Sequence, residues 1–360
     1  MSSPFLTPEQ SRQRRALAAR RLRRRRLGGL AVLCGLALAA IGALAFAGGS
    51  SGHRGDPSRH TAAPGGAAAS APALSPAGLA LAKPALALGG LYSAASDPIH
   101  IDFHAPPRAA LLFNLSTGQV LWQRNAERRL HIASLTKMMT ALVSVRSAPP
   151  RAPVVVRRAA IESGGSKVGV LPLGRRVRLE SMLYGLMLPS GNDAAIALAE
   201  HVSGSVGAFV QRMNEQAAQL GMGCTHYTSP SGYYDAGNFS CAADLAILAH
   251  VDMSEPRIAR VARTYSAVLP FPIKGGKLYL YNNNPLLIYH YPGVTGLKTG
   301  WTLSAGRCLV ATAERGGVRL GVVILDSNAP GTQARQLLDR GFRDVYHLPP
   351  VSEPPIPAGA

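Results

Sequence analysis

The stretch GLKTGWTLSAGRCLVATAERGGVRLGVVIL, residues 296–325, decides the fold. It holds three short apolar runs, Gly296–Thr302, Arg307–Ala313 and Val318–Leu325, which are separated by small residues and glycines. Short apolar runs bounded by turn residues are typical of antiparallel strands. The stretch therefore predicts a three-stranded antiparallel meander.

Segments on both sides of this meander complete an α+β pattern. Ala109–Asn114 and Gln119–Gln123 predict a β-hairpin, and Gln333–Phe342 predicts a closing helix packed back on the sheet. A strand pair, a long helical insert, three strands and a helix fit an α+β domain better than alternating βα units. The helices expected in the insert are Ser134–Val145, Glu180–Leu188, Asp193–Val202, Val206–Leu220 and Ala242–His250.

The formal charge of +19 over 360 residues has two separate sources. Residues 1–97 hold 12 basic and 3 acidic side chains, a net +9, so residues 98–360 hold 26 and 16, a net +10. Nine of the first 12 are arginines within residues 12–26. An arginine cluster ahead of an apolar run is the asymmetry that orients membrane segments, with the cluster in the cytoplasm.

Leu27–Ala47 is that apolar run, and it contains no charged residue. About 20 apolar residues suffice to cross a bilayer as a helix, so an uncleaved, single-pass anchor is the favoured interpretation. The alternative is a cleaved signal peptide, because Ala45-Phe46-Ala47 fits the small-x-small cleavage pattern. Both interpretations place the rest of the chain outside the cytoplasm.

The expected organisation follows from these shifts in composition. It comprises a cytoplasmic basic segment at 1–26, the anchor or signal at 27–47, a disordered Ala/Gly/Pro/Ser linker at 48–97, one large domain at 98–346 and a Pro-rich tail at 347–360.

Four cysteines rule out a disulfide-dense scaffold. Cys34 lies in the apolar run, and Cys224, Cys241 and Cys308 lack zinc-type spacing. A Cys224–Cys241 disulfide is one alternative, but sequence cannot give connectivity. Three buried, unpaired thiols are the favoured expectation.

Ser134 and Lys137 carry the first catalytic signal. They lie three residues apart at the start of a strong helical pattern, so their side chains share one face. A serine hydroxyl becomes a good nucleophile when a neighbouring base takes its proton, and lysine serves as that base when burial or another cation lowers its pKa. Alone the motif is weak, because serine at a helix start is usually only an N-cap.

Two further motifs strengthen this signal. Ser190–Asn192 lies in a turn between two predicted helices. Lys298–Gly300 lies in the first strand of the meander, where a lysine among apolar residues needs a partner. Taken singly, they are explained as a helix cap and an edge-strand lysine. Together with Ser134 and Lys137, on helix, turn and strand, they indicate a serine active site.

These motifs resemble the active-site set of serine penicillin-binding proteins and class A β-lactamases. The strings ASLTKMMT at 133–140, PSGNDAA at 189–195 and GLKTG at 296–300 are similar to the D-alanyl-D-alanine carboxypeptidases of peptidase family S11. The resemblance covers about residues 105–346. It implies that 98–346 is catalytic, with a β-lactamase/transpeptidase-like fold, a mostly antiparallel sheet flanked by helices.

The resemblance implies acyl transfer on a peptidoglycan stem peptide that ends in D-Ala-D-Ala. Ser134 would attack the penultimate D-Ala carbonyl and release the terminal D-Ala, after which water hydrolyses the ester; penicillin and other β-lactams would acylate the same serine. No metal or cofactor is implied. The resemblance implies that Lys137 is the base, that Ser190 relays a proton and that Asn192 binds the peptide amide. Lys298 would attract the substrate carboxylate, Thr299 would bind it, and Gly300 would contact the substrate. The backbone N–H groups of Ser134 and Trp301 would form the oxyanion hole.

Three features depart from the family pattern. Trp301 stands where a smaller or polar residue is usual, so the pocket rim is expected to differ. Residues 326–331 lack the arginine that often assists carboxylate binding, and Arg335 is expected on the closing helix. The Pro-rich tail leaves no room for the β-rich domain and C-terminal anchor of many relatives, so residues 27–47 are expected to supply the anchoring.

The same residues distinguish this function from four alternative ones. A class A β-lactamase would carry a glutamate in an E-x-x-L-N string, and none lies between Asn192 and Lys298. D,D-endopeptidase action would use the same site and stays open, whereas a non-catalytic peptidoglycan-binding module is disfavoured because every motif residue is present. Nucleic-acid binding rests on charge alone and lacks aromatic-basic interleaving, and the H-E-x-x-H motif of metal hydrolases is absent.

Overall fold

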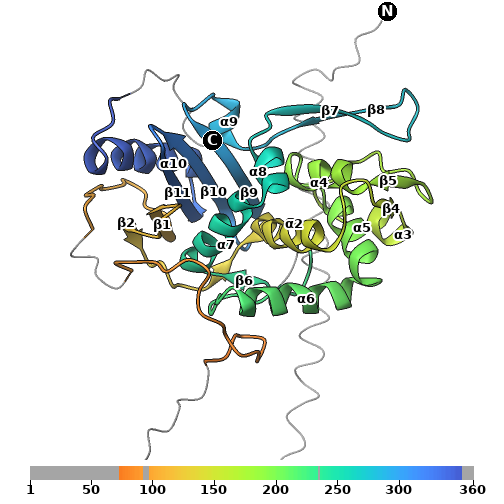
Figure 1. The fold of residues 1–360 in the computed structure, drawn as a ribbon, viewed down its shortest axis with the longest axis horizontal. Helices are drawn as coiled ribbons and strands as arrows, with labels where there is room; N and C mark the ends of the chain where they lie inside the picture. The colour runs from red at the N-terminus through yellow and green to blue at the C-terminus, as the bar shows by residue number, and fades with distance from the viewer. Residues whose placement is uncertain (1–72, 92–96, 234–235, 351–360) are drawn as a thin grey trace, which may run out of the picture. The chain divides into compact units, whose positions relative to one another are not determined.

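A five-stranded antiparallel sheet forms the centre of the fold. The computed structural model describes residues 73–91, 97–233 and 236–350 (Figure 1). The strand order is β2-β1-β11-β10-β9, and every neighbouring pair is antiparallel. The strands are β1 (Ala109–Asn114), β2 (Val120–Arg124), β9 (Val294–Thr302), β10 (Gly306–Arg315) and β11 (Val318–Ser327). The predicted hairpin and meander are confirmed.

Helices cover both faces of this sheet (Figure 1). Alternate side chains of a strand point to opposite faces, and all six residues of β1 are buried. Leu111 and Phe113 belong to the hydrophobic cluster of the helical insert. Leu112 belongs to the cluster of the C-terminal helix α10 (Pro330–Arg340), which continues into a π-helical turn at Gly341–Val345. Burial on both faces explains why the strands are apolar throughout instead of alternating.

The insert between β2 and β9 is mainly helical, which confirms the predicted α+β class. Its central helix, α2 (Thr136–Ser147), is buried from Thr136 to Val145. The short helix α8 (Pro256–Ala262) was not predicted, because seven residues give too little periodicity to recognise. The other helices are α3 (Arg158–Glu162), α4 (Leu179–Met187), α5 (Asn192–Ser203), α6 (Val206–Gln219), α7 (Ala242–Ser254), α8 (Pro256–Ala262) and α9 (Pro285–Ile288).

Three two-stranded sheets interrupt the insert, and sequence analysis predicted none of them. Strands of two to five residues carry too few alternations to be recognised locally. The pairs are β3 (Leu130–His131) with β6 (Phe239–Ser240), β4 (Pro153–Val155) with β5 (Arg176–Arg178), and β7 (Ser266–Pro270) with β8 (Lys277–Tyr281).

Residues 73–91 have a defined course along the domain, which differs from the disordered linker expected over 48–97. The N–H groups of Ala82 and Ala85 donate to the carbonyls of Ala218 and Leu220, at 3.0 and 3.1 Å. Gly89 forms a parallel bridge with Gln119. Its composition did not predict this ordered structure, because backbone atoms make most of these contacts.

A disulfide joins Cys224 to Cys241, whereas Cys308 is free and buried. The expectation of unpaired thiols was therefore wrong for two of the three. The two cysteines lie on separate segments that an antiparallel bridge between His226 and Phe239 brings together, and the local sequence does not reveal that proximity. Cys34 lies outside the described residues.

Within residues 73–91, 97–233 and 236–350, no helix has the length and apolar character needed to cross a bilayer. The predicted segment Leu27–Ala47 lies outside these residues.

Candidate active site

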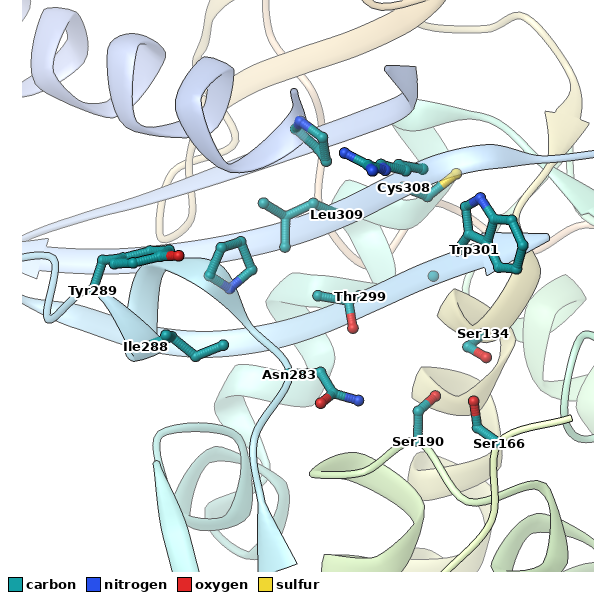
Figure 2. Close-up of a pocket in the computed structure, with 14 residues that line it drawn as sticks. Ser134, Ser166, Ser190, Asn283, Ile288, Tyr289, Thr299, Trp301, Cys308 and Leu309 are labelled. Carbon is teal, nitrogen blue, oxygen red and sulfur yellow. The ribbon is translucent and has the colours of Figure 1, made fainter. Parts of the chain in front are cut away.

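A pocket of about 510 Å³ lies where the insert meets the edge strand β9. Ser134, Ser166 and Ser190 line one end, and Figure 2 shows their hydroxyl groups gathered near Trp301. Thr299 lies farther along β9, and Tyr289 at the far end (Figure 2). None of the described residues that line the pocket is acidic.

Ser134 and Lys137 meet as the sequence predicted. Ser134 lies in a 3-10 turn, Ala133–Leu135, directly before α2. The Nζ of Lys137 donates to the Oγ of Ser134 at 2.8 Å and to the backbone carbonyl of Ser231 at 2.9 Å. Lys137 is fully buried, whereas Ser134 is partly exposed at the pocket. A nucleophile with a hydrogen-bonded amine behind it is the arrangement that activated serines require.

Neighbouring side chains fix this turn. The Oγ1 of Thr136 donates to the carbonyl of Ala133 at 2.8 Å, and the Nδ2 of Asn238 donates to that Oγ1 at 2.7 Å. Gly232 lies against the Ala133 carbonyl so closely that a Cβ would collide with it, and its φ of 72° is one that glycine adopts freely. The segment after Ser231 thus holds the nucleophile turn from behind.

Ser190 lies on the opposite wall, in the turn between α4 and α5, and Asn192 is the first residue of α5 behind it. Ser190 adopts a positive φ of 64°, a conformation that costs a non-glycine residue on the order of 1 kcal/mol. Its Oγ is buried without a hydrogen-bond partner, as is the Oδ1 of Asn192. The Nδ2 of Asn192 donates to the Gly164 carbonyl at 2.6 Å. The unpartnered hydroxyl of Ser190 at the pocket wall is therefore available to a substrate.

Asp193, in the first turn of α5, attaches a neighbouring loop to this turn. Its carboxylate accepts the N–H groups of Val168 and Gly169 at 2.9 and 3.0 Å, and that of Ala194 at 2.8 Å. The N–H of Asn192 donates to the Ser166 carbonyl at 2.7 Å. These bonds bring Ser166 into the pocket, a residue that no local motif had indicated.

The strand β9 forms the third wall with Thr299, Gly300 and Trp301. A Cβ on Gly300 would lie 2.9 Å from the Ile132 carbonyl and 3.2 Å from the Ser134 nitrogen, so only glycine lets the strand approach the nucleophile turn. Trp301 is 62% exposed at the rim. Five of the predicted site residues thus line one pocket, namely Ser134, Ser190, Thr299, Gly300 and Trp301.

Lys298 does not line this pocket. Its side chain is 1% exposed, and its Nζ donates to the Thr299 carbonyl at 3.0 Å. Burial lowers the pKa of Lys298 to about 7, because desolvation disfavours the charged form. Part of the Lys298 population is therefore neutral at physiological pH.

Arg307 is a pocket residue that sequence analysis missed. It lies on β10 directly opposite Trp301, and its Nη1 donates to the Asn328 carbonyl at 3.1 Å. It is the one cationic side chain among the described residues that line the pocket. The expectation that Arg335 lies on the closing helix is confirmed, and it is not among the residues that line the pocket.

No metal site is supported by the described side chains. Their one grouping of three potential ligands is Cys224, Cys241 and Asp244, and its two sulfur atoms are joined in the disulfide.

Comparison with known proteins identifies the family. The sequence profile of the D-alanyl-D-alanine carboxypeptidases, peptidase family S11, matches residues 94–329. The chain belongs to the peptidase S11 family. Within it, the chain is 35% identical to DacF of Bacillus subtilis over 243 residues and 36% identical to DacB2 of Mycobacterium tuberculosis over 245 residues. These alignments cover 65% and 66% of the chain, and 62% and 82% of the respective relative.

Solved S11-type structures confirm the fold. A mutant of the Streptomyces K15 DD-transpeptidase superposes with a TM-score of 0.63 at 30% identity, over 67% of this chain and 99% of that one. A D-alanyl-D-alanine carboxypeptidase from Mycobacterium tuberculosis H37Rv gives 0.63 at 32% identity, over 71% and 96%. The chain thus has the penicillin-binding DD-peptidase fold that the resemblance implied.

Proposed function

We propose that this S11 protein is a serine-type D-Ala-D-Ala carboxypeptidase that removes the terminal D-Ala from peptidoglycan stem peptides and is acylated by penicillin. The hydrogen bond of 2.8 Å between Lys137 and Ser134 carries the proposal. Curated relatives named D-alanyl-D-alanine carboxypeptidases support it. Ser134 is then the nucleophile, and neutral Lys137 takes its hydroxyl proton as the new C–O bond forms.

The backbone N–H groups of Ser134 and Trp301 are proposed to stabilise the tetrahedral oxyanion. Support comes from the close approach of β9 to the nucleophile turn at Gly300, where a Cβ would lie 3.2 Å from the Ser134 nitrogen. Oxyanion donors of this kind are typically worth about 3 kcal/mol each.

Collapse of this intermediate breaks the C–N bond. Ser190 is proposed to pass a proton to the leaving D-Ala nitrogen, and Asn192 to bind the substrate amide; their buried, unpartnered oxygens support both roles. Water then hydrolyses the ester and restores the Ser134 hydroxyl. Because no described pocket residue is acidic, no carboxylate is placed to activate that water as in class A β-lactamases, which favours slow β-lactam turnover.

The substrate carboxylate is proposed to bind between Thr299 and Arg307. Thr299 presents its hydroxyl in the pocket (Figure 2), and Arg307 supplies a cation on the next strand. Buried Lys298 attracts the anion from beneath the strand through its charged fraction.

We also propose that Leu27–Ala47 anchors the chain, with the catalytic domain facing the cell wall. The disulfide supports the outer location, because such bonds persist in oxidising compartments. A membrane-extracted protein whose N-terminal sequence begins near Gly48 would show a cleaved signal instead.

Release of D-Ala from diacetyl-Lys-D-Ala-D-Ala tests the function directly. The wild-type protein should release D-Ala, and Ser134→Ala should abolish it; unchanged release would contradict the proposal. A parallel assay on a cross-linked dimeric muropeptide separates carboxypeptidase from endopeptidase action.

A further inference from the structure

The β7–β8 hairpin carries exposed rings on one face. Strand alternation turns Leu278 and Leu280 inward, where each is 4% exposed, and turns Tyr279 and Tyr281 outward, where they are 60% and 62% exposed. Val268, opposite Tyr279 in the register, is also exposed. Figure 1 shows the hairpin lying over α4. Contiguous exposed rings of this kind mark interaction sites.

This face is continuous with the pocket. The N–H of Asn282, next to Tyr281, donates to the Tyr265 carbonyl at 2.8 Å. The ring of Tyr265 contacts that of His290 with centroids 5.7 Å apart, and Tyr289, the preceding residue, lines the pocket. Tyr279, Tyr281, Tyr265 and His290 are hereafter the aromatic row.

The chain itself limits how far the row lies from the pocket. Asn283 lines the pocket and follows Tyr281 by two residues and Tyr279 by four. Two residues span at most about 7 Å and four at most about 14 Å. A substrate peptide of four residues has the same maximum reach, so the row lies within the distance at which a polymer attached to its other end is found.

The charge around the row suits a polymer that carries carboxylates, as stem peptides do. Residues 256–313 contain no Asp or Glu but seven Lys or Arg. Lys274 and Lys277 are exposed on the hairpin. Opposite charges increase the association rate and orient the partner.

We propose that the aromatic row binds the glycan strand to which the stem peptide is attached. This inference rests on the proposed function, because the peptide in the pocket fixes where its sugars lie. A tyrosine ring offers an apolar face to the C–H side of a sugar and a hydroxyl for its polar groups, and it loses little conformational entropy on binding. The row's alignment with the pocket favours glycan over a phospholipid surface, which would not need that alignment.

The test compares two substrates on the full chain. Tyr279→Thr with Tyr281→Thr removes the rings and keeps β-branched residues suited to a strand; Tyr279→Phe with Tyr281→Phe is the matched control. For the variant with both threonines, hereafter the Thr pair, kcat/KM on uncross-linked pentapeptide attached to glycan should fall five- to tenfold because KM rises. The kcat/KM for D-Ala release from diacetyl-Lys-D-Ala-D-Ala should stay within twofold of the wild-type value. The Phe pair should keep most of the wild-type rate. An equal loss on both substrates, or no loss on the polymer, overturns the proposal.

Pelleting with purified sacculi separates this inference from the proposed function. Ser134→Ala protein should pellet with sacculi, and adding the Thr pair should reduce the bound fraction at least threefold, whether or not the wild type releases D-Ala. Unchanged pelleting overturns the glycan assignment. If the Thr pair instead loses binding to anionic phospholipid vesicles while its pelleting with sacculi is unchanged, the aromatic row is a membrane-binding face. That result also overturns the glycan assignment.

Discussion

Lys137 shows how a single buried residue obtains a chemical role. Its amine is held between the Ser134 hydroxyl and the Ser231 carbonyl, and its side chain has no exposed surface. The Ser134 hydroxyl therefore has an amine within hydrogen-bond distance to accept its proton.

Replacing Lys137 by Met should therefore abolish acylation without unfolding the domain. Met fills a similar volume, and loss of a positioned base typically slows a reaction 10²- to 10⁴-fold. The measurements are the acylation rate with a fluorescent penicillin and the thermal midpoint. Lys167→Met is the control, because Lys167 is exposed. An acylation rate within tenfold of wild type would exclude Lys137 as the base.

Arg307 allows a second test at this scale. An exposed charge pair is worth up to about 1 kcal/mol, so Arg307→Gln should raise KM for a C-terminal carboxylate peptide about fivefold and leave kcat nearly unchanged. Arg307→Lys should recover part of this loss. Acylation by a penicillin methyl ester, which lacks the carboxylate, should not respond to either change. A fall in kcat with constant KM would place Arg307 outside the carboxylate site.

The local motifs were predictable and the assembled pocket was not. Ser134 and Lys137 share a helix face because they lie three residues apart, and this spacing is visible in the sequence itself. Arg307 and Ser166 reach the pocket through strand register and the bonds of Asp193, which join segments far apart in the chain. No single stretch of sequence encodes that proximity.

At the scale of elements, the segment closed by Cys224 and Cys241 supports the nucleophile, because it contains Ser231. Closing a loop of this length restricts the unfolded chain by about 3 kcal/mol. Cys224→Ser with Cys241→Ser should lower the free energy of unfolding by about that amount, measured in urea. Cys308→Ser is the control, because this thiol is free. An unchanged free energy in the double variant would show that the bond does not stabilise the domain.

Asp244 sits beside this disulfide and should make stability depend on pH. Burial raises its pKa to about 6, despite bonds from Thr225 and Cys224. A raised pKa in the folded state gives stability that is complete below pH 4 and is lost as the pH rises through 6. The stability difference between wild type and Asp244→Asn should therefore shift by about 3 kcal/mol between pH 4 and 7. Urea unfolding at four pH values measures it, and a constant difference would contradict the burial argument.

The short strand pairs show where sequence reasoning ends at this scale. β7 and β8 have the alternation of a half-exposed hairpin, with Leu278 and Leu280 inward. Five residues supply only two or three repeats of that pattern. In the central sheet, β1, β10 and β11 were predictable because burial on both faces makes them largely apolar.

At the scale of the whole molecule, composition misjudged the segment ahead of the domain. Residues 73–91 are rich in Ala, Gly, Pro and Leu, yet they run along α6 and the β1–β2 turn through backbone bonds. Leu86 is buried against the core. Backbone pairing is independent of side-chain type, so composition could not reveal it.

The measurement that tests the central claim most directly is mass spectrometry of the full chain after reaction with benzylpenicillin. One covalent adduct should form, and peptide mapping should place it on Ser134. Ser134→Ala protein should remain unmodified under the same conditions. An adduct on another residue, or an equal yield of adduct in Ser134→Ala, would contradict the assignment of Ser134 as the nucleophile.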